Sequence, residues 1–127
     1  MALQDHIPAD DNFVQFVQRA LDDREVWGLR SHAGWAVCDS LDYANRPVVP
    51  FWSSRAQAQR AAIDDWAEYE ATPIALSRFV SAWLVGMAEK RILAGTNWDA
   101  MNCGLEVEPE DLAEQLKRAD RKWPPLR

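Results

Sequence analysis

Apolar residues recur every three or four positions in two stretches of the chain, and this spacing predicts two amphipathic helices. The first stretch consists of Phe13, Phe16, Val17, Ala20 and Leu21. Asp10, Asp11 or Asn12 is expected to cap the first turn of this helix. The second and longer stretch consists of Leu76, Phe79, Val80, Trp83, Leu84 and Met87. Each helix is therefore expected to pack on the core through one face.

Two further helices are predicted from the residues at their ends. Ser54 and Gln57 have the spacing of a capping box, so a helix is expected to start here and to end near Asp65. Pro109 suits the first position of a last helix, which is expected to end near Arg118 because basic residues stabilise a helix C-terminus. The residues expected to dock these two helices are Ala58, Ala61, Ala62, Leu112 and Leu116.

Segments rich in β-branched and aromatic residues predict about five short strands. Val26–Arg30 and Trp35–Asp39 are expected to form a hairpin around a tight turn. Arg46–Trp52 is a third strand, which its two prolines restrict to a sheet edge or to irregular ends. Ile92–Trp98 and Cys103–Val107 are expected to form a second hairpin, with Asp99, Ala100, Met101 and Asn102 in its turn.

These elements predict a single α+β domain with a mostly antiparallel sheet of about five short strands and about four packed helices. The segment 66–73 has no clear period and is expected to be a connector, with or without a short strand. The domain is expected to span residues 10–119, between a flexible N-terminus of residues 1–9 and a frayed C-terminal tail of residues 120–127.

Seven tryptophans in 127 residues make this chain unusually rich in large aromatic side chains. Trp83 lies in a helical apolar stripe and is expected in the core. Trp27 and Trp35 are expected to face each other across the first hairpin. The remaining tryptophans of the domain lie at the ends of elements beside polar residues, which suits either ordinary packing or a shared surface groove: Trp52, Trp66 and Trp98.

The chain carries a formal net charge of -6, and its basic residues are scattered, so nonspecific nucleic-acid binding is not expected. An acidic surface favours a basic protein partner instead. The segment 1–8 contains no apolar run, so neither a signal peptide nor a membrane span is expected, and the protein is expected in the cytoplasm. In that reducing compartment Cys38 and Cys103 are expected to be buried thiols.

No catalytic residue, cofactor or metal site is expected from the spacing of the reactive residues. His6 and His32 lack orienting partners, and the two cysteines lack further ligands at metal-binding spacing. Asp64, Asp65 and Glu68 belong to the densest acidic stretch, for which a solvated helix end is the simpler interpretation. The acidic residues between 106 and 114 are interpreted in the same way, as complements to a helix start. The glycines are isolated and form no phosphate loop.

Several Trp, Gly and Pro positions occur in an order that resembles a known family. The segments that carry the resemblance are Val26–Leu29, Gly34–Cys38, Val49–Ser53, Phe79–Leu84, Asn97–Asp99 and Gly104–Leu112. Over residues 12–118 the chain resembles the DUF2750 family of unknown function. The resemblance implies a small bacterial α+β domain and assigns no catalytic residue. The segment Pro50–Ser53 with the alanine-rich stretch after it is also similar to the type III secretion SseB-like proteins.

Two functions of different classes are compatible with these observations. The first is a noncatalytic protein-binding module, for example a bacterial immunity or accessory factor with a basic partner. The alternative is a small-molecule binder or modest enzyme that uses a tryptophan-lined groove. A protein partner is expected to bind at the acidic residues Asp64, Asp65 and Glu68. The small-molecule groove is expected near Trp52, Trp66 and Trp98, with Arg55, Asn97 or Asp99 as its polar contacts.

Overall fold

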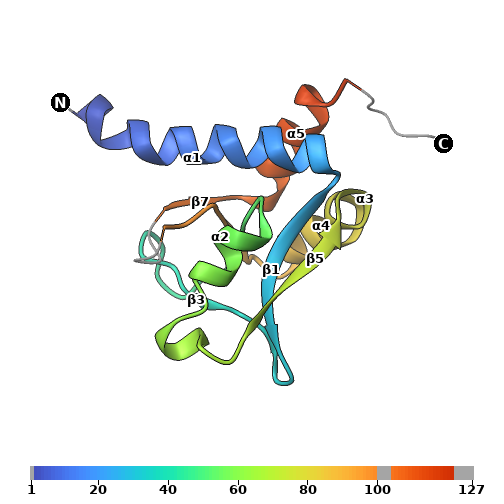
Figure 1. Ribbon diagram of the computed structural model, residues 1–127. Helices are drawn as coiled ribbons and strands as arrows, with labels where there is room; N and C mark the ends of the chain where they lie inside the picture. The colour runs from blue at the N-terminus through green and yellow to red at the C-terminus, as the bar shows by residue number, and fades with distance from the viewer. Residues whose placement is uncertain (1, 100–103, 122–127) are drawn as a thin grey trace.

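The computed structural model describes residues 2–99 and 104–121, with side chains from residue 11 onward, and shows helices packed around two connected sheets (Figure 1). The helices are α1 (Ala2–Asp23), α2 (Arg55–Arg60), α3 (Leu76–Arg78), α4 (Leu84–Glu89) and α5 (Pro109–Ala119), with a 3-10 turn η1 (Asp64–Trp66) and a π-helical turn η2 (Phe79–Trp83). The strands are β1 (Glu25–Ser31), β2 (Gly34–Trp35), β3 (Cys38–Asp39), β4 (Pro47–Phe51), β5 (Glu70–Ala75), β6 (Leu93–Thr96) and β7 (Leu105–Val107). The α+β class is confirmed, although the described strands number about seven rather than five.

The strands form one sheet in the order β2-β1-β5 and a second in the order β3-β4-β6-β7. All described pairings are antiparallel except that of β4 with β6, which run parallel because α2, β5 and the α3–α4 segment connect them. The sheets meet at one antiparallel bridge, where Trp27 N donates to Trp52 O at 2.7 Å and Trp52 N to Trp27 O at 2.8 Å. This bridge joins the two sheets through backbone hydrogen bonds.

The first predicted hairpin is divided between the two sheets. β1 and β2 pair around a tight turn as expected, but Trp35 lies opposite Arg30, so it does not face Trp27 across the hairpin. Trp27 lies opposite Pro73 of β5 instead. The second arm then continues as β3, which pairs with β4 of the other sheet. The Trp35 ring packs edge-on against Trp83 at a centroid distance of 4.7 Å.

The segment predicted as a connector contains β5, a six-residue strand. A strand is possible here despite Pro73 because β5 lies at the edge of its sheet, where a missing N–H breaks no ladder bond. Gln59 of α2 accepts a hydrogen bond from Ala71 N at 3.2 Å. Together the proline and this side chain leave β5 with few free donors for edge-to-edge pairing.

The predicted helix near Ser54 is confirmed at its start and wrong at its end. Ser54 Oγ accepts a hydrogen bond from Gln57 N at 3.2 Å, as the capping box requires. The helix ends at Arg60 and not near Asp65, because Ile63 is extended and Asp64 adopts a left-handed φ of 53°. The acidic stretch therefore lies on η1 and the turn after it.

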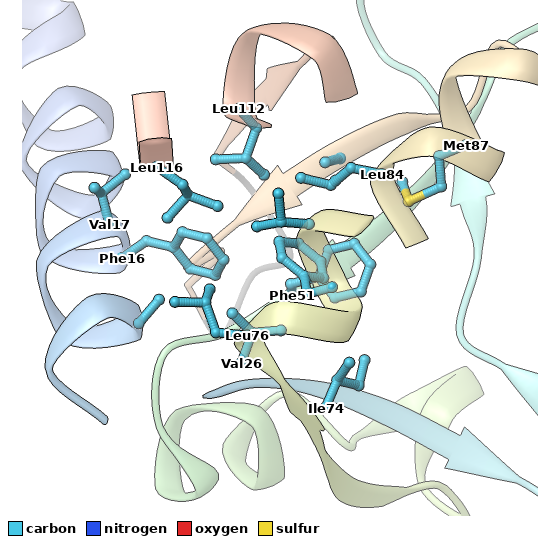
Figure 2. Packing of buried hydrophobic residues seen from close by; sticks show 14 residues of the cluster. Phe16, Val17, Val26, Phe51, Ile74, Leu76, Leu84, Met87, Leu112 and Leu116 are labelled. Carbon is cyan, nitrogen blue, oxygen red and sulfur yellow. The ribbon is translucent and has the colours of Figure 1, made fainter. Parts of the chain in front are cut away.

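The two amphipathic stripes form most of one core (Figure 2). Phe16 and Val17 of α1 meet Leu112 and Leu116 of α5 in this cluster, while the stripe from Leu76 to Met87 packs against Phe51. The second stripe lies on one continuous helical segment, in which the π-helix η2 joins the α-helices α3 and α4. The described part of α1 begins at Ala2, so Asp10, Asp11 and Asn12 lie within the helix and do not cap it.

A second core lies against α2 and η1 and consists of Leu29, Ala36, Val48, Trp52, Ala58, Ala61, Trp66, Leu93 and Trp98. Trp83, expected in the core, is only half-buried. Among the tryptophans that the structure describes, the most buried are thus Trp52, Trp66 and Trp98, the three whose place the sequence left open.

An ion pair links the residue after α1 to the residue after α5. Arg24 donates from Nη1 and Nη2 to both carboxylate oxygens of Asp120, at 2.7 and 2.8 Å. Asp120 is 8 % exposed, although it falls in the segment expected to fray. The rest of the expected tail, residues 122–127, lies outside the described residues, as do Cys103 and the turn residues Ala100, Met101 and Asn102.

Candidate functional site

A groove of about 500 Å³ lies between the segment 37–41, which contains β3, and the segment 63–69, which contains η1. Three apolar side chains on its lining are exposed to solvent: Val37 by 51 %, Leu41 by 81 % and Ile63 by 41 %. The lining consists of Val37, Cys38, Asp39, Leu41, Ile63, Asp64, Asp65, Trp66, Tyr69 and Trp98. We refer to this surface as the acidic groove.

Trp66 and Trp98 join the acidic groove to the second core. Trp98 is fixed in place, because its Nε1 donates to Leu105 O at 3.1 Å. Its ring also lies against two glycines. A Cβ at Gly95 would come within 2.4 Å of Trp98 Cε2, and a Cβ at Gly104 within 2.4 Å of Trp98 Cδ1. Because Gly95 and Gly104 have no side chain, they leave the space that the Trp98 indole occupies.

A buried hydrogen-bond network lies directly beneath Trp98. Trp52 is fully buried, and its Nε1 donates to Trp98 O at 2.9 Å. Asn97 Oδ1 accepts from Ser53 N at 2.8 Å, and Asn97 Nδ2 donates to Ser53 Oγ at 3.0 Å. Asn97 has a left-handed φ of 49°, which Asn tolerates better than most residues. This network connects the end of β4 to the turn after β6 and holds Trp98 in register.

The exposed rim formed by the loop after β3 is fixed by Glu106 of β7. The Glu106 carboxylate accepts hydrogen bonds from Ser40 Oγ and, at 3.0 Å, from Leu41 N. Ser40 Oγ in turn accepts from Asp42 N at 3.0 Å and from Tyr43 N at 2.8 Å. Leu41 is thus presented to solvent on a loop whose backbone is hydrogen-bonded.

The other end of this loop is held by Arg46 and Glu108. Arg46 donates from Nη1 and Nη2 to the Glu108 carboxylate at 2.7 and 2.9 Å, and from Nε to Arg91 O at 3.0 Å. This bidentate hydrogen bonding lowers the pKa of Glu108 and raises that of Arg46. Glu106 and Glu108 were interpreted from the sequence as complements to a helix start, but both bind the rim loop.

The ion pair predicts a small pH dependence of stability. Because Arg46 lowers the pKa of Glu108 in the folded chain, the pair stabilises the fold at neutral pH, and this contribution is lost as the pH falls through the folded-state pKa. Between about pH 7 and pH 3, wild type should lose up to about 1 kcal/mol more than Glu108→Gln, since such partly exposed pairs contribute little. Urea denaturation across this range measures the difference. An equal difference for the exposed control Glu89→Gln would contradict the assignment.

The charged groups that line the acidic groove are all carboxylates. They are Asp39 of β3 and Asp64 and Asp65 of η1, and the described lining contains no Lys, Arg or His. Cys38 is half-buried in the same groove rather than fully buried, and its pKa is raised by burial and by the charges of Glu106 and Asp39. A raised pKa keeps this sulfur in the thiol form, which is a weak nucleophile.

The structure separates the nine residues predicted from the sequence into four groups. Asp64, Asp65, Trp66 and Trp98 line the acidic groove. A smaller pocket of about 260 Å³, which shares Trp98 with the groove, is lined by Asn12, Gln57, Arg60, Ala61, Asn97, Trp98 and Asp99. Trp52 is buried beneath both pockets and does not line the groove expected for it. Arg55 and Glu68 are exposed and line neither of these two pockets.

Sequence reasoning missed six residues of the acidic groove: Val37, Cys38, Asp39, Leu41, Ile63 and Tyr69. Leu41, between Ser40 and Asp42 in a predicted loop, and Ile63, directly before two aspartates at a predicted helix end, were an available signal. Cys38 and Asp39 were assigned to an ordinary hairpin strand, and only the crossing of this strand between sheets places them in the groove.

Neither a metal cluster nor a membrane span is found in the part of the chain that the structure describes. No group of three or more His, Cys, Asp or Glu in this part of the chain, whose side chains are described from residue 11 onward, is arranged to hold a metal ion. No helix in it combines the length and apolar character of a membrane span.

Comparison with known proteins gives one match. The family model described as a protein of unknown function (DUF2750) matches residues 13–116 of the 127-residue chain. No curated protein and no solved structure matches the chain. The likeness to SseB-like proteins is not supported by these comparisons.

Proposed function

The chain belongs to the DUF2750 family, and we propose that it is a noncatalytic protein-binding module whose binding surface is the acidic groove. The observation that carries this proposal is the exposure of Val37, Leu41 and Ile63 around one groove. Single exposed apolar residues are common on protein surfaces, but a group of them around a hollow is typical of an interaction site.

Rigidity of the groove supports the proposal. Leu41 is held through Glu106, and Trp98 through its hydrogen bond to Leu105 O. A surface that is already ordered loses little conformational entropy when a partner binds. Trp66, Tyr69 and Trp98 add the aromatic side chains in which binding hot spots are enriched.

The proposal predicts that peptides selected on the full chain bind through the apolar rim. A random peptide library displayed on phage is selected on immobilised wild type, and the affinities of the enriched peptides are measured by calorimetry. Replacing Val37, Leu41 and Ile63 together with serine should weaken binding by about tenfold or more, because buried apolar anchors dominate such interfaces.

The matched control for this experiment is Val14→Ser. Val14 is 50 % exposed on α1, outside the acidic groove, and Val37 is 51 % exposed, so Val14→Ser removes about as much exposed apolar side chain as the single change Val37→Ser without touching the rim. Stability of all variants is checked by thermal denaturation, and each surface change should alter it by about 0.5 kcal/mol or less. Failure to enrich any peptide on wild type, or equal weakening by Val14→Ser, would reject the acidic groove as a protein-binding surface.

A small-molecule site is a second candidate function, and the volume of the groove favours it. About 500 Å³ lies in the range of ligand pockets, and three aromatic side chains line it. Trp66 and Trp98 in the lining make intrinsic fluorescence a direct probe. A saturable change with a metabolite, together with no peptide enrichment, would favour this function over protein binding.

A further inference from the structure

We infer that the acidic groove selects a peptide segment that carries a lysine or arginine among apolar residues. This inference rests on the proposed protein-binding function and adds the chemistry of the partner. The groove combines an exposed apolar rim with carboxylates from two separate segments, β3 and η1. An apolar side chain of the segment would contact the rim, and its cation would be bound by the carboxylates.

The carboxylates of the groove differ from those beside it. Glu106 and Glu108 are bound to Ser40, Leu41 and Arg46. In the described part of the chain, the side chains of Asp39, Asp64 and Asp65 form no hydrogen bond or ion pair. These three negative charges are therefore left to interact with a bound group.

The backbone and the fold keep these charges together. Asp64 is held in the left-handed conformation at the start of η1, and Asp65 follows it directly. Asp39 lies in β3, which is paired to β4 at Cys38 and Asp39. Like charges on ordered segments repel one another, and a cation placed among them removes this repulsion.

The aromatic lining accommodates the rest of a basic side chain. Long basic residues place their methylene stems on apolar surface while the charged end reaches a polar group. Trp66, Tyr69 and Trp98 provide such a surface beside the three carboxylates. The aromatic rings also attract a cation directly when it lies over a ring face. The acidic groove thus offers a basic side chain both an apolar surface for its stem and negative charges for its cation.

The test uses the full chain and peptides enriched on wild type. Each peptide is compared with a version in which its lysine or arginine is replaced by methionine, which keeps an apolar chain and removes the charge. We expect about tenfold weaker binding after this replacement at low salt, with the loss decreasing as salt is raised. Asp39→Asn, Asp64→Asn and Asp65→Asn should each weaken binding by about twofold to fivefold, and together by more than tenfold.

The variants are chosen to preserve the fold. Asn accepts the left-handed backbone at position 64, and all three aspartates are exposed. Glu68→Gln is the matched control, since Glu68 belongs to the same acidic stretch but does not line the groove. It should change affinity by less than about twofold.

The outcomes separate this inference from the function on which it rests. Enriched peptides that bind through the apolar rim but contain no basic residue would overturn the inference and leave protein binding standing. Affinity that does not respond to the triple Asn variant would do the same. No peptide enrichment at all would reject protein binding itself. N-acetyl-lysine methylamide binding as tightly as the peptides would assign the groove to a small organic cation and overturn the inference.

Discussion

Gly95→Ala is expected to destabilise the fold by about 2–3 kcal/mol, because the added methyl group has no space. Its Cβ would lie 2.4 Å from Trp98 Cε2, well inside van der Waals contact. The indole cannot move away easily, since the Gly104 backbone lies against another part of the ring, close enough that a Cβ on Gly104 would come within 2.4 Å of Trp98 Cδ1. The backbone is also restricted, because Gly95 pairs with Pro50 on one side and Glu106 on the other. Urea denaturation measures the loss as a lower midpoint.

Two comparisons make this prediction specific to the Trp98 contact. Gly86→Ala should stabilise the fold by about 0.5–1 kcal/mol, because Gly86 lies in α4 and a Cβ there meets nothing within 4 Å. In the double variant Gly95→Ala, Trp98→Ala, the methyl group fits into the space left by the indole. The combined cost should therefore be smaller than the sum of the single costs. Additive costs, or an unchanged midpoint for Gly95→Ala, would show that the ring is not confined as described.

Asn97→Ala is expected to cost about 3 kcal/mol for two separate reasons. It removes the acceptor for the buried Ser53 N–H and the donor to Ser53 Oγ. A buried donor left without a partner costs about 1–3 kcal/mol. Position 97 also has a left-handed φ of 49°, which Asn tolerates because its side chain forms hydrogen bonds. Alanine has no such side chain, and holding it in this conformation adds about 1 kcal/mol. Thermal or urea denaturation measures the sum.

Asn97→Gly and Asn97→Asp separate the two reasons. Glycine accepts the left-handed backbone but lacks the amide, so it should recover about 1 kcal/mol relative to alanine. Aspartate keeps an acceptor for Ser53 N but introduces a buried charge and loses the donor, so it should not restore stability. If Asn97→Gly were as stable as wild type, the Ser53 hydrogen bonds would contribute nothing and the network would not hold the turn.

The helices were the most predictable part of this protein. The stripes around Phe16 and Leu84 are local patterns with a period of 3.6 residues, and both become faces buried in the first core. The cap at Ser54 is equally local, because one side chain and one backbone N–H three residues away are sufficient. The end of that helix was not predictable. Asp64 has a left-handed backbone conformation, and the sequence signal for that conformation is a glycine, which is absent here.

The candidate site was predictable only in part. Asp64, Asp65, Trp66 and Trp98 were identified as candidates and line the acidic groove. Trp52 was identified with them, but its side chain points to the carbonyl of Trp98 in the interior. An indole beside polar residues is compatible with a surface position and with a buried hydrogen bond. Sequence alone does not distinguish the two, because the deciding partner is 46 residues away.

The sequence by itself determined the α+β class, the amphipathic faces of α1 and the segment from Leu76 to Met87, the cap of α2 at Ser54 and the start of α5 at Pro109. Each of these depends on residues within a few positions of one another. The tertiary structure decided that β3 crosses to the second sheet, that β4 and β6 run parallel, and that Glu106 and Glu108 hold the loop carrying Leu41. Those features depend on contacts between distant segments, and a linear pattern of polar and apolar residues does not specify which surfaces meet.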